Sequence, residues 1–158
     1  MPLVDIVIDT NVFLHAENPQ EPRQRDADAL LNKIRACVVQ LCVDDGFDIV
    51  EAQNRSVIGA EYLKWLRAGS LGYALVTFLA GSARLKILPR AVPAKVSKAI
   101  RTQVPNGPDR TFLKIAFNSQ EKVLSSHDFN DIPQTVRNRL FAQVGLSVVD
   151  ADRAKALL

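Results

Sequence analysis

The sequence has few cysteines, no long apolar run and no strong excess of either charge. Its 158 residues contain two cysteines, Cys37 and Cys42, with no CxxC pair and no Cys/His cluster. A chain of this length can bury a core without disulfides, so we expect free thiols in a reducing, cytoplasmic compartment. The residues for a cysteine-based zinc site are absent.

Apolar stretches are too short for a membrane protein. The longest, residues 71–81, falls well below the length that spans a bilayer. Asp5 and Asp9 interrupt the apolar stretch at the N-terminus, so no export signal is expected either. We therefore expect a soluble protein without membrane contact. Residues 71–81 should form a buried core helix, and a homodimer face is the alternative.

The charge balance excludes little. There are 20 Lys and Arg against 17 Asp and Glu, a net charge of +3, which permits a nucleic-acid partner without requiring one. No repeat, linker or low-complexity segment occurs, so a single domain over residues 1–158 is expected.

Short β-branched runs alternate with segments of helical periodicity. The predicted strands are residues 4–8, 38–43, 47–50, 85–88, 122–125 and 146–149. Strands separated by helices pair in parallel, which predicts an α/β fold with helices on both faces of the sheet. Asp45-Gly46 is typical of a hairpin, so the sheet is expected to be locally antiparallel there.

Apolar residues spaced by three and four predict the buried faces of four helices. Their members are Ala27, Leu30, Leu31, Ile34 and Val38; Ile58, Tyr62, Trp65 and Leu66; Val92, Val96, Ala99 and Ile100; and Val136, Leu140, Phe141 and Val144.

The first strand ends in three polar residues, Asp9, Thr10 and Asn11. In open α/β sheets, ligands bind outside the carboxyl ends of the strands, which makes Asp9 a candidate site residue. The alternative is that one of the three side chains caps the following helix. The strand alone leaves both interpretations open.

Other acidic residues favour a site. Asp109 begins the apolar stripe of a helix, although it is also placed to cap that helix. Glu61 lies at the rim of another apolar helix face. Asp128 follows the strand at 122–125, with Asp131 three residues later, and a turn-forming role is the alternative there.

Convergence of these carboxylates would require a cation. Two like charges about 5 Å apart repel by roughly 3 kcal/mol at an effective dielectric near 20. Several such pairs exceed what a marginally stable domain tolerates. No Lys or Arg adjoins Asp9, and all candidate ligands are oxygens, which suits Mg²⁺ or Mn²⁺.

Four segments together resemble the PIN-domain family of metal-dependent nucleases. They are IVIDTNVFL (6–14), with a D-[TS]-N signature; IGAEYLKWL (58–66) and DRTFLKIAF (109–117), two helices that each bring an acid; and VLSSHDF (123–129), a strand followed by an acidic turn. The likeness runs in order from about residue 4 to residue 150.

The sequence departs from the family pattern at two acids. Family members often have the second acid soon after the first strand, whereas a helix and the expected hairpin precede Glu61. The fourth site is often D-x-D-F, and here it reads Ser126-His127-Asp128-Phe129. Aligned on the Phe, the usual first Asp becomes Ser126; aligned on Ser-x-Asp, Asp128 is itself the fourth acid and one residue is missing. We choose the second alignment, and Asp131 is the other candidate for the fourth acid.

The resemblance implies a three-layer α/β/α sandwich and a metal-dependent endoribonuclease that cleaves single-stranded or structured RNA. Asp9, Glu61, Asp109 and Asp128 would be catalytic and hold Mg²⁺ or Mn²⁺. Phosphate contacts should dominate substrate binding. The residues expected to contact the substrate are Thr10, Asn11, Ser126, Lys95, Lys98, Arg110 and Lys114.

Other functions stay open at this stage. The chain could be the toxin of a toxin–antitoxin pair, with an antitoxin protein as partner, or a DNA-directed nuclease. It could also be a catalytically silent PIN-fold module for RNA binding or assembly. A haloacid-dehalogenase-like phosphotransferase is disfavoured, because it needs a second Asp where this chain has Asn11. His15 and His127 are expected to be surface or satisfied residues, and assistance to proton transfer is the alternative.

Overall fold

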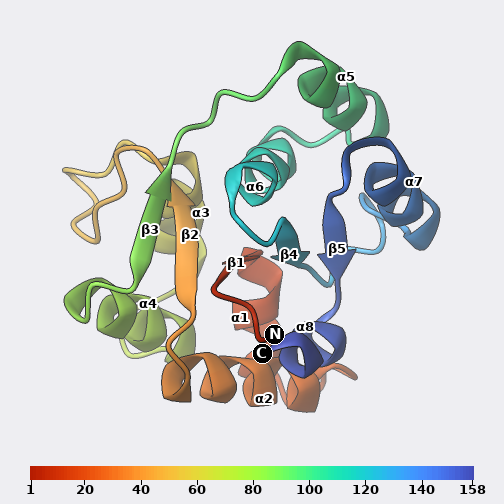
Figure 1. Cartoon of the computed structure of the whole chain (residues 1–158). Helices are drawn as coiled ribbons and strands as arrows, with labels where there is room; N and C mark the ends of the chain where they lie inside the picture. Colours follow the sequence, from red (N-terminus) through yellow and green to blue (C-terminus); the bar gives the residue numbers. More distant parts are fainter.

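Five short strands form one parallel sheet in the computed structural model, which describes residues 1–158 (Figure 1). They are β1 (Asp5–Ile8), β2 (Gln40–Asp44), β3 (Leu85–Leu88), β4 (Val123–Ser125) and β5 (Ser147–Val149), in the order β3-β2-β1-β4-β5. The chain runs outward from β1 to β3 and then returns to β4 and β5. The carboxyl ends of β1 and β4 therefore flank the point where the strand order reverses, which is where such sheets bind ligands.

Helices in two packed groups cover the sheet, which confirms the predicted three-layer α/β/α fold. Helices α1, α2, α4 and α8 contact one another on one side, α5, α6 and α7 form the second group, and α3 contacts both α1 and α6 (Figure 1). The bounds are α1 (Thr10–Ala16), α2 (Gln24–Ala36), α3 (Val57–Trp65), α4 (Leu71–Gly81), α5 (Ala94–Gln103), α6 (Gly107–Asn118), α7 (Gln134–Val144) and α8 (Ala151–Leu157).

The predicted hairpin at Asp45-Gly46 is wrong, because all four strand pairs are parallel and residues 47–50 form no strand. The buried carboxylate of Asp44, at the end of β2, accepts hydrogen bonds from the backbone N–H groups of Val57 (2.8 Å) and Ile58 (2.9 Å). These bonds tie the first turn of α3 to β2. The chain after Gly46 is therefore a loop that leads into a helix.

Most of the predicted buried faces lie in one hydrophobic cluster of 35 buried residues. Three predictions are wrong: Val38, Trp65 and Phe141 are 92%, 49% and 62% exposed. Val38 lies beyond the end of α2, Trp65 is the last residue of α3, and Phe141 lies on the solvent side of α7.

Residues 71–81 form α4, which buries Leu75, Val76 and Leu79 in the core. The longest helix, α2, has 13 residues, and no helix has the length and hydropathy needed to cross a bilayer. Cys37 and Cys42 are both free thiols.

Candidate metal centre

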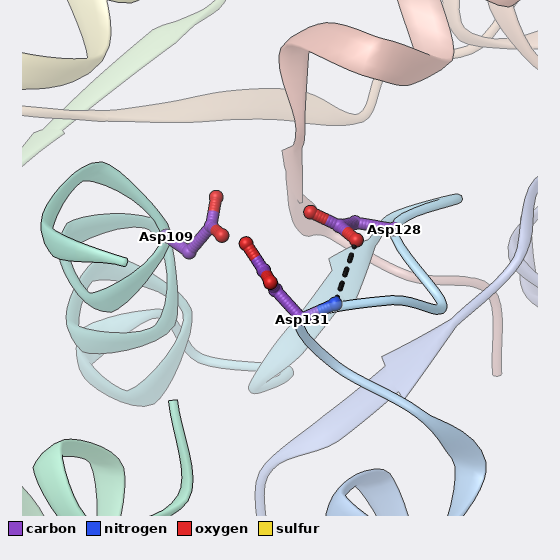
Figure 2. A group of neighbouring side chains, drawn as sticks. All are labelled: Asp109, Asp128 and Asp131. Atoms are coloured by element: carbon purple, nitrogen blue, oxygen red, sulfur yellow. Dashed lines mark hydrogen bonds between the residues drawn. The ribbon is translucent and has the colours of Figure 1, made fainter. Parts of the chain in front are cut away.

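Three aspartates converge at the carboxyl edge of the sheet. Asp109 lies in the first turn of α6, and Asp128 and Asp131 lie in the loop after β4. One carboxylate oxygen from each lies within 4.8 Å of the other two. Figure 2 shows the side chains of Asp109 and Asp131 pointing toward one another. Asp128 Oδ1 accepts a hydrogen bond from the backbone N–H of Asp131 (2.9 Å), which holds the two loop acids together.

Asp9 lies at the adjoining end of β1 and is bonded to the same loop. Its Oδ2 atom accepts hydrogen bonds from Ser126 Oγ (2.7 Å) and Asn11 Nδ2 (3.0 Å). Ser126 Oγ in turn accepts from the backbone N–H of Asp128 (3.1 Å). Both side-chain bonds to Asp9 go to one oxygen, so Oδ1 has no side-chain donor.

The capping interpretation fails for both candidates. Asp9 occupies the N-cap position of α1, but its side chain makes no capping hydrogen bond. The side chain that caps α6 is Asn106, whose Oδ1 accepts from the backbone N–H of Asp109 (3.4 Å). Both carboxylates are therefore left free of the local role that the sequence also allowed.

The electrostatics of the cluster are unfavourable to ionised carboxylates. Burial raises the pKa of Asp9 to about 6, against the lowering effect of the Ser126 hydrogen bond, and the charge of Asp128 raises it further. Burial also raises the pKa of Asp109 to about 7, with contributions from the negative charges of Asp9, Asp128, Asp131 and Glu61. Five acids therefore act on one another at this edge of the sheet.

Glu61, on α3, belongs to this set because its charge also acts on Asp109, and its side chain makes no hydrogen bond. The neighbouring Tyr62 is buried and donates its hydroxyl to the carbonyl of Ile8 (2.5 Å), directly before Asp9. Its ring also packs against Phe13 of α1 and Phe112 of α6 at centroid distances of 5.2 and 6.1 Å. This aromatic cluster fixes the three helices that surround the acids.

Arg137 of α7 organises the loop that carries Asp128 and Asp131. Its buried guanidinium donates to the carbonyl oxygens of Ile132 (2.7 Å), Ser126 (3.0 Å) and Asp128 (3.2 Å). Burial lowers the pKa of Arg137 to about 10, so the group is still charged at neutral pH.

The Arg137→Ala variant is expected to unfold more easily by about 3 kcal/mol, because three loop carbonyls lose a charged donor. Urea denaturation measures this difference. The control is Arg139→Ala, an exposed residue of the same helix, which should change stability by less than about 0.5 kcal/mol. Equal midpoints for the two variants would contradict the structural role of Arg137.

His15 and His127 form a pair beside the acids. Their Nδ1 atoms are 2.8 Å apart, and His127 Nε2 accepts from the backbone N–H of Ala151 (3.1 Å). Neutral His127 must therefore carry its proton on Nδ1 and donate it to His15. Burial lowers the pKa of His127 to about 4, with help from His15 and Arg23, so the pair is neutral at pH 7.

The predicted substrate-binding residues fall in different places. Ser126 and Asn11 are bonded to Asp9, as described above, and Thr10 is buried with no partner for its hydroxyl. Arg110 Nε donates to the carbonyl of Val104 (2.7 Å), and Lys114 is half-buried on the same helix. Lys95 and Lys98 line a separate cavity between α5 and α7 that none of the acids lines.

Sequence reasoning missed several residues that build the site. Asp44 was detectable, because it ends β2 as Asp9 ends β1, but its carboxylate holds the start of α3. Arg137 gave no signal of its role, although its three acceptors lie only 5 to 11 positions earlier, and nothing local showed that His15 pairs with His127, 112 positions away.

The residues present fit a hard divalent cation. All the donors are carboxylate oxygens, the kind of ligand that Mg²⁺ and Mn²⁺ prefer. Asp109 Oδ2 is buried and has no hydrogen-bond partner, so an acceptor oxygen inside the cluster is left for a positive ligand. No lysine or arginine forms a salt bridge with any of the five acids.

Comparison with protein-family models, curated proteins and solved structures finds no match for this chain.

Proposed function

We propose that this protein is a metal-dependent nuclease that hydrolyses phosphodiester bonds in RNA. The observation that carries the proposal is the convergence of Asp109, Asp128 and Asp131, with one buried oxygen of Asp109 left without a partner. A buried carboxylate oxygen without a partner is costly, and acids with a perturbed pKa concentrate at functional sites. The order of four acidic segments that resemble PIN-domain nucleases supports the same conclusion.

Asp9, Asp109, Asp128 and Asp131 would hold Mg²⁺ or Mn²⁺, with Glu61 at the edge of the set. The bound ion would supply an activated water at neutral pH and offset negative charge that develops on the phosphate. Ser126 and Asn11 fix the carboxylate of Asp9 through Oδ2 and leave Oδ1 for this task. Arg137 and the Asp131 N–H hold the loop acids in position.

RNA as substrate, a toxin role and an antitoxin partner are finer parts of the proposal. They rest on the resemblance to PIN domains, in which many small stand-alone members act as toxins. Cleavage of DNA but not RNA would favour a DNA-directed nuclease. Binding of RNA without cleavage would favour a catalytically silent RNA-binding module.

The test is incubation of the purified protein with end-labelled single-stranded RNA and DNA of the same sequence, in Mn²⁺, in Mg²⁺ and in EDTA. Cleavage of RNA that requires the metal is the expected result. Metal-independent cleavage, or intact RNA in every condition, would contradict the proposal. Cleavage of DNA alone would identify DNA, and not RNA, as the substrate.

A further inference from the structure

A second feature lies directly beside the acids: an open cavity of about 450 Å³ between the segment that precedes α2 and the loop after β4. Asp128 lines this cavity and also belongs to the acidic cluster, so the two sites adjoin. The other walls include Arg23, His127, Phe129 and Asn130. A ligand in this cavity would lie next to whatever the acids hold.

Arg23 is the only lysine or arginine among the residues that line the cavity. Its guanidinium lies over the ring of Phe129, 4.5 Å from the centroid, and Arg137 lies 3.9 Å from the centroid of the same ring. Stacking restricts the plane of the guanidinium while leaving its N–H donors at the edge. Phe129 thus serves as a platform that orients Arg23.

The guanidinium of Arg23 has no hydrogen-bond acceptor and no salt bridge in the structure. By contrast, the three other arginines that are not exposed, Arg84, Arg110 and Arg137, donate to backbone carbonyls. All five N–H donors of Arg23 are therefore available to an external acceptor.

The remaining walls of the cavity do not satisfy Arg23. Glu21 is the nearest acid in sequence, but its Oε1 accepts from the backbone N–H of Arg23 (3.3 Å) and its Oε2 faces His15 Nε2 (3.6 Å). His15 and His127 are bonded to each other. The side-chain amide of Asn11 donates to Asp9 and accepts from the backbone N–H of His127. The uncommitted donors in the cavity are thus Arg23 and the exposed Asn130.

We infer that this cavity binds a backbone phosphate of the nucleic-acid strand, next to the phosphate that is cleaved, with Arg23 as its principal ligand. This inference rests on the proposed function. A planar guanidinium suits a phosphate because it donates two parallel hydrogen bonds to two oxygens. A phosphate here carries no sequence information, so the subsite positions the strand across the acids without selecting bases.

The experiment measures binding of fluorescein-labelled single-stranded RNA and DNA of one sequence by anisotropy in EDTA, so that no cleavage occurs. Arg23→Ala is expected to bind about 10-fold more weakly, the loss expected for a charged hydrogen-bonding contact. Arg23→Lys should recover part of the affinity, because it keeps the charge but not the planar group. The matched control is Arg25→Ala, an exposed arginine two residues away that does not line the cavity, which should stay within about 2-fold of wild type.

The dependence on salt gives a second readout. The slope of log affinity against log salt should fall by about 0.7 in Arg23→Ala and less in Arg25→Ala, because one phosphate contact is lost. Equal affinities and slopes for the two alanine variants would overturn the subsite, as would a wild-type protein that binds neither nucleic acid. Equal losses on RNA and DNA support a backbone contact, whereas a loss on one alone would contradict it.

Failure of this inference is distinguishable from failure of the proposed function. Binding that depends on Arg23, without any cleavage in Mn²⁺, would support the phosphate subsite and contradict the proposed nuclease activity. Metal-dependent cleavage with a KM unchanged in Arg23→Ala would support the nuclease activity and contradict the subsite.

Discussion

Replacing Asp9 with asparagine is expected to reduce RNA cleavage in Mn²⁺ by about 10³-fold or more, because a neutral amide cannot take the place of a carboxylate that holds the cation. The substitution keeps the size of the side chain and an oxygen that can accept from Ser126. Burial raises the pKa of Asp9 to about 6, so the ionised group opposes folding at pH 8. The variant should therefore unfold at the same temperature as wild type or higher.

Single-turnover cleavage and thermal unfolding of the same preparation test this prediction. The control is Asp45→Asn, which makes the same change of charge at an exposed aspartate directly after β2. It should cleave at the wild-type rate. Full activity in a folded Asp9→Asn protein would remove Asp9 from the site, and a large loss of stability would contradict the argument from its pKa.

Mn²⁺ should stabilise the protein strongly at pH 8 and much less at pH 5. At 100 times its Kd, a ligand that binds only the folded state adds about 2.7 kcal/mol. This corresponds to a rise in Tm of about 5–10 °C for a chain of this size. The pKa values of Asp9 and Asp109 are raised to about 6 and about 7, so both acids are largely protonated at pH 5 and compete with the cation.

Without metal, Asp9 and Asp109 should make the protein more stable at pH 5 than at pH 8, the opposite of the trend in the Mn²⁺ effect. At pH values between 3.8, the usual pKa of an aspartate, and their raised pKa values, Asp9 and Asp109 bind more protons in the folded state than in the unfolded state. Their contribution to stability therefore increases as the pH falls from 8 toward 5. His127, with its pKa lowered from 6.5 to about 4, opposes this trend below about pH 6.5, because the unfolded state takes up its proton first.

Differential scanning calorimetry in EDTA and in Mn²⁺, at pH 5 and pH 8, separates these effects. In Asp109→Asn, most of the rise in Tm that Mn²⁺ causes at pH 8 should be lost. In EDTA at pH 8 it should be more stable than wild type by on the order of 2 kcal/mol, a figure reduced for solvent screening of a half-buried group. A metal shift of equal size at both pH values would contradict the assignment of these two acids as ligands.

Much of the fold could be predicted because it is encoded locally. Alternation of β-branched runs with helical periodicity predicted the parallel sheet and its helical layers, since burial on two faces requires those patterns. The positions of Asp9 at the end of β1 and Asp109 at the start of α6 followed from the same local signals. The sequence therefore predicted which acids stand at the ends of elements that the fold brings to one edge.

Local patterns failed where a distant partner decides the structure. Asp45-Gly46 looks like a hairpin, but the carboxylate of Asp44 holds the first turn of α3 and so draws the following chain into a helix. Trp65 and Phe141 have helical spacing from core residues, yet no element covers them.

The sequence by itself determined the elements and the acids at their ends, because hydrophobic periodicity and strand termini involve neighbouring residues. Only the tertiary structure decided the hydrogen bonds that arrange those acids. Ser126 reaches Asp9 across 117 positions, and His15 meets His127 across 112. The free guanidinium of Arg23 likewise depends on a platform, Phe129, from another part of the chain. Such bonds form between groups that folding brings together, so no periodicity along the chain records them.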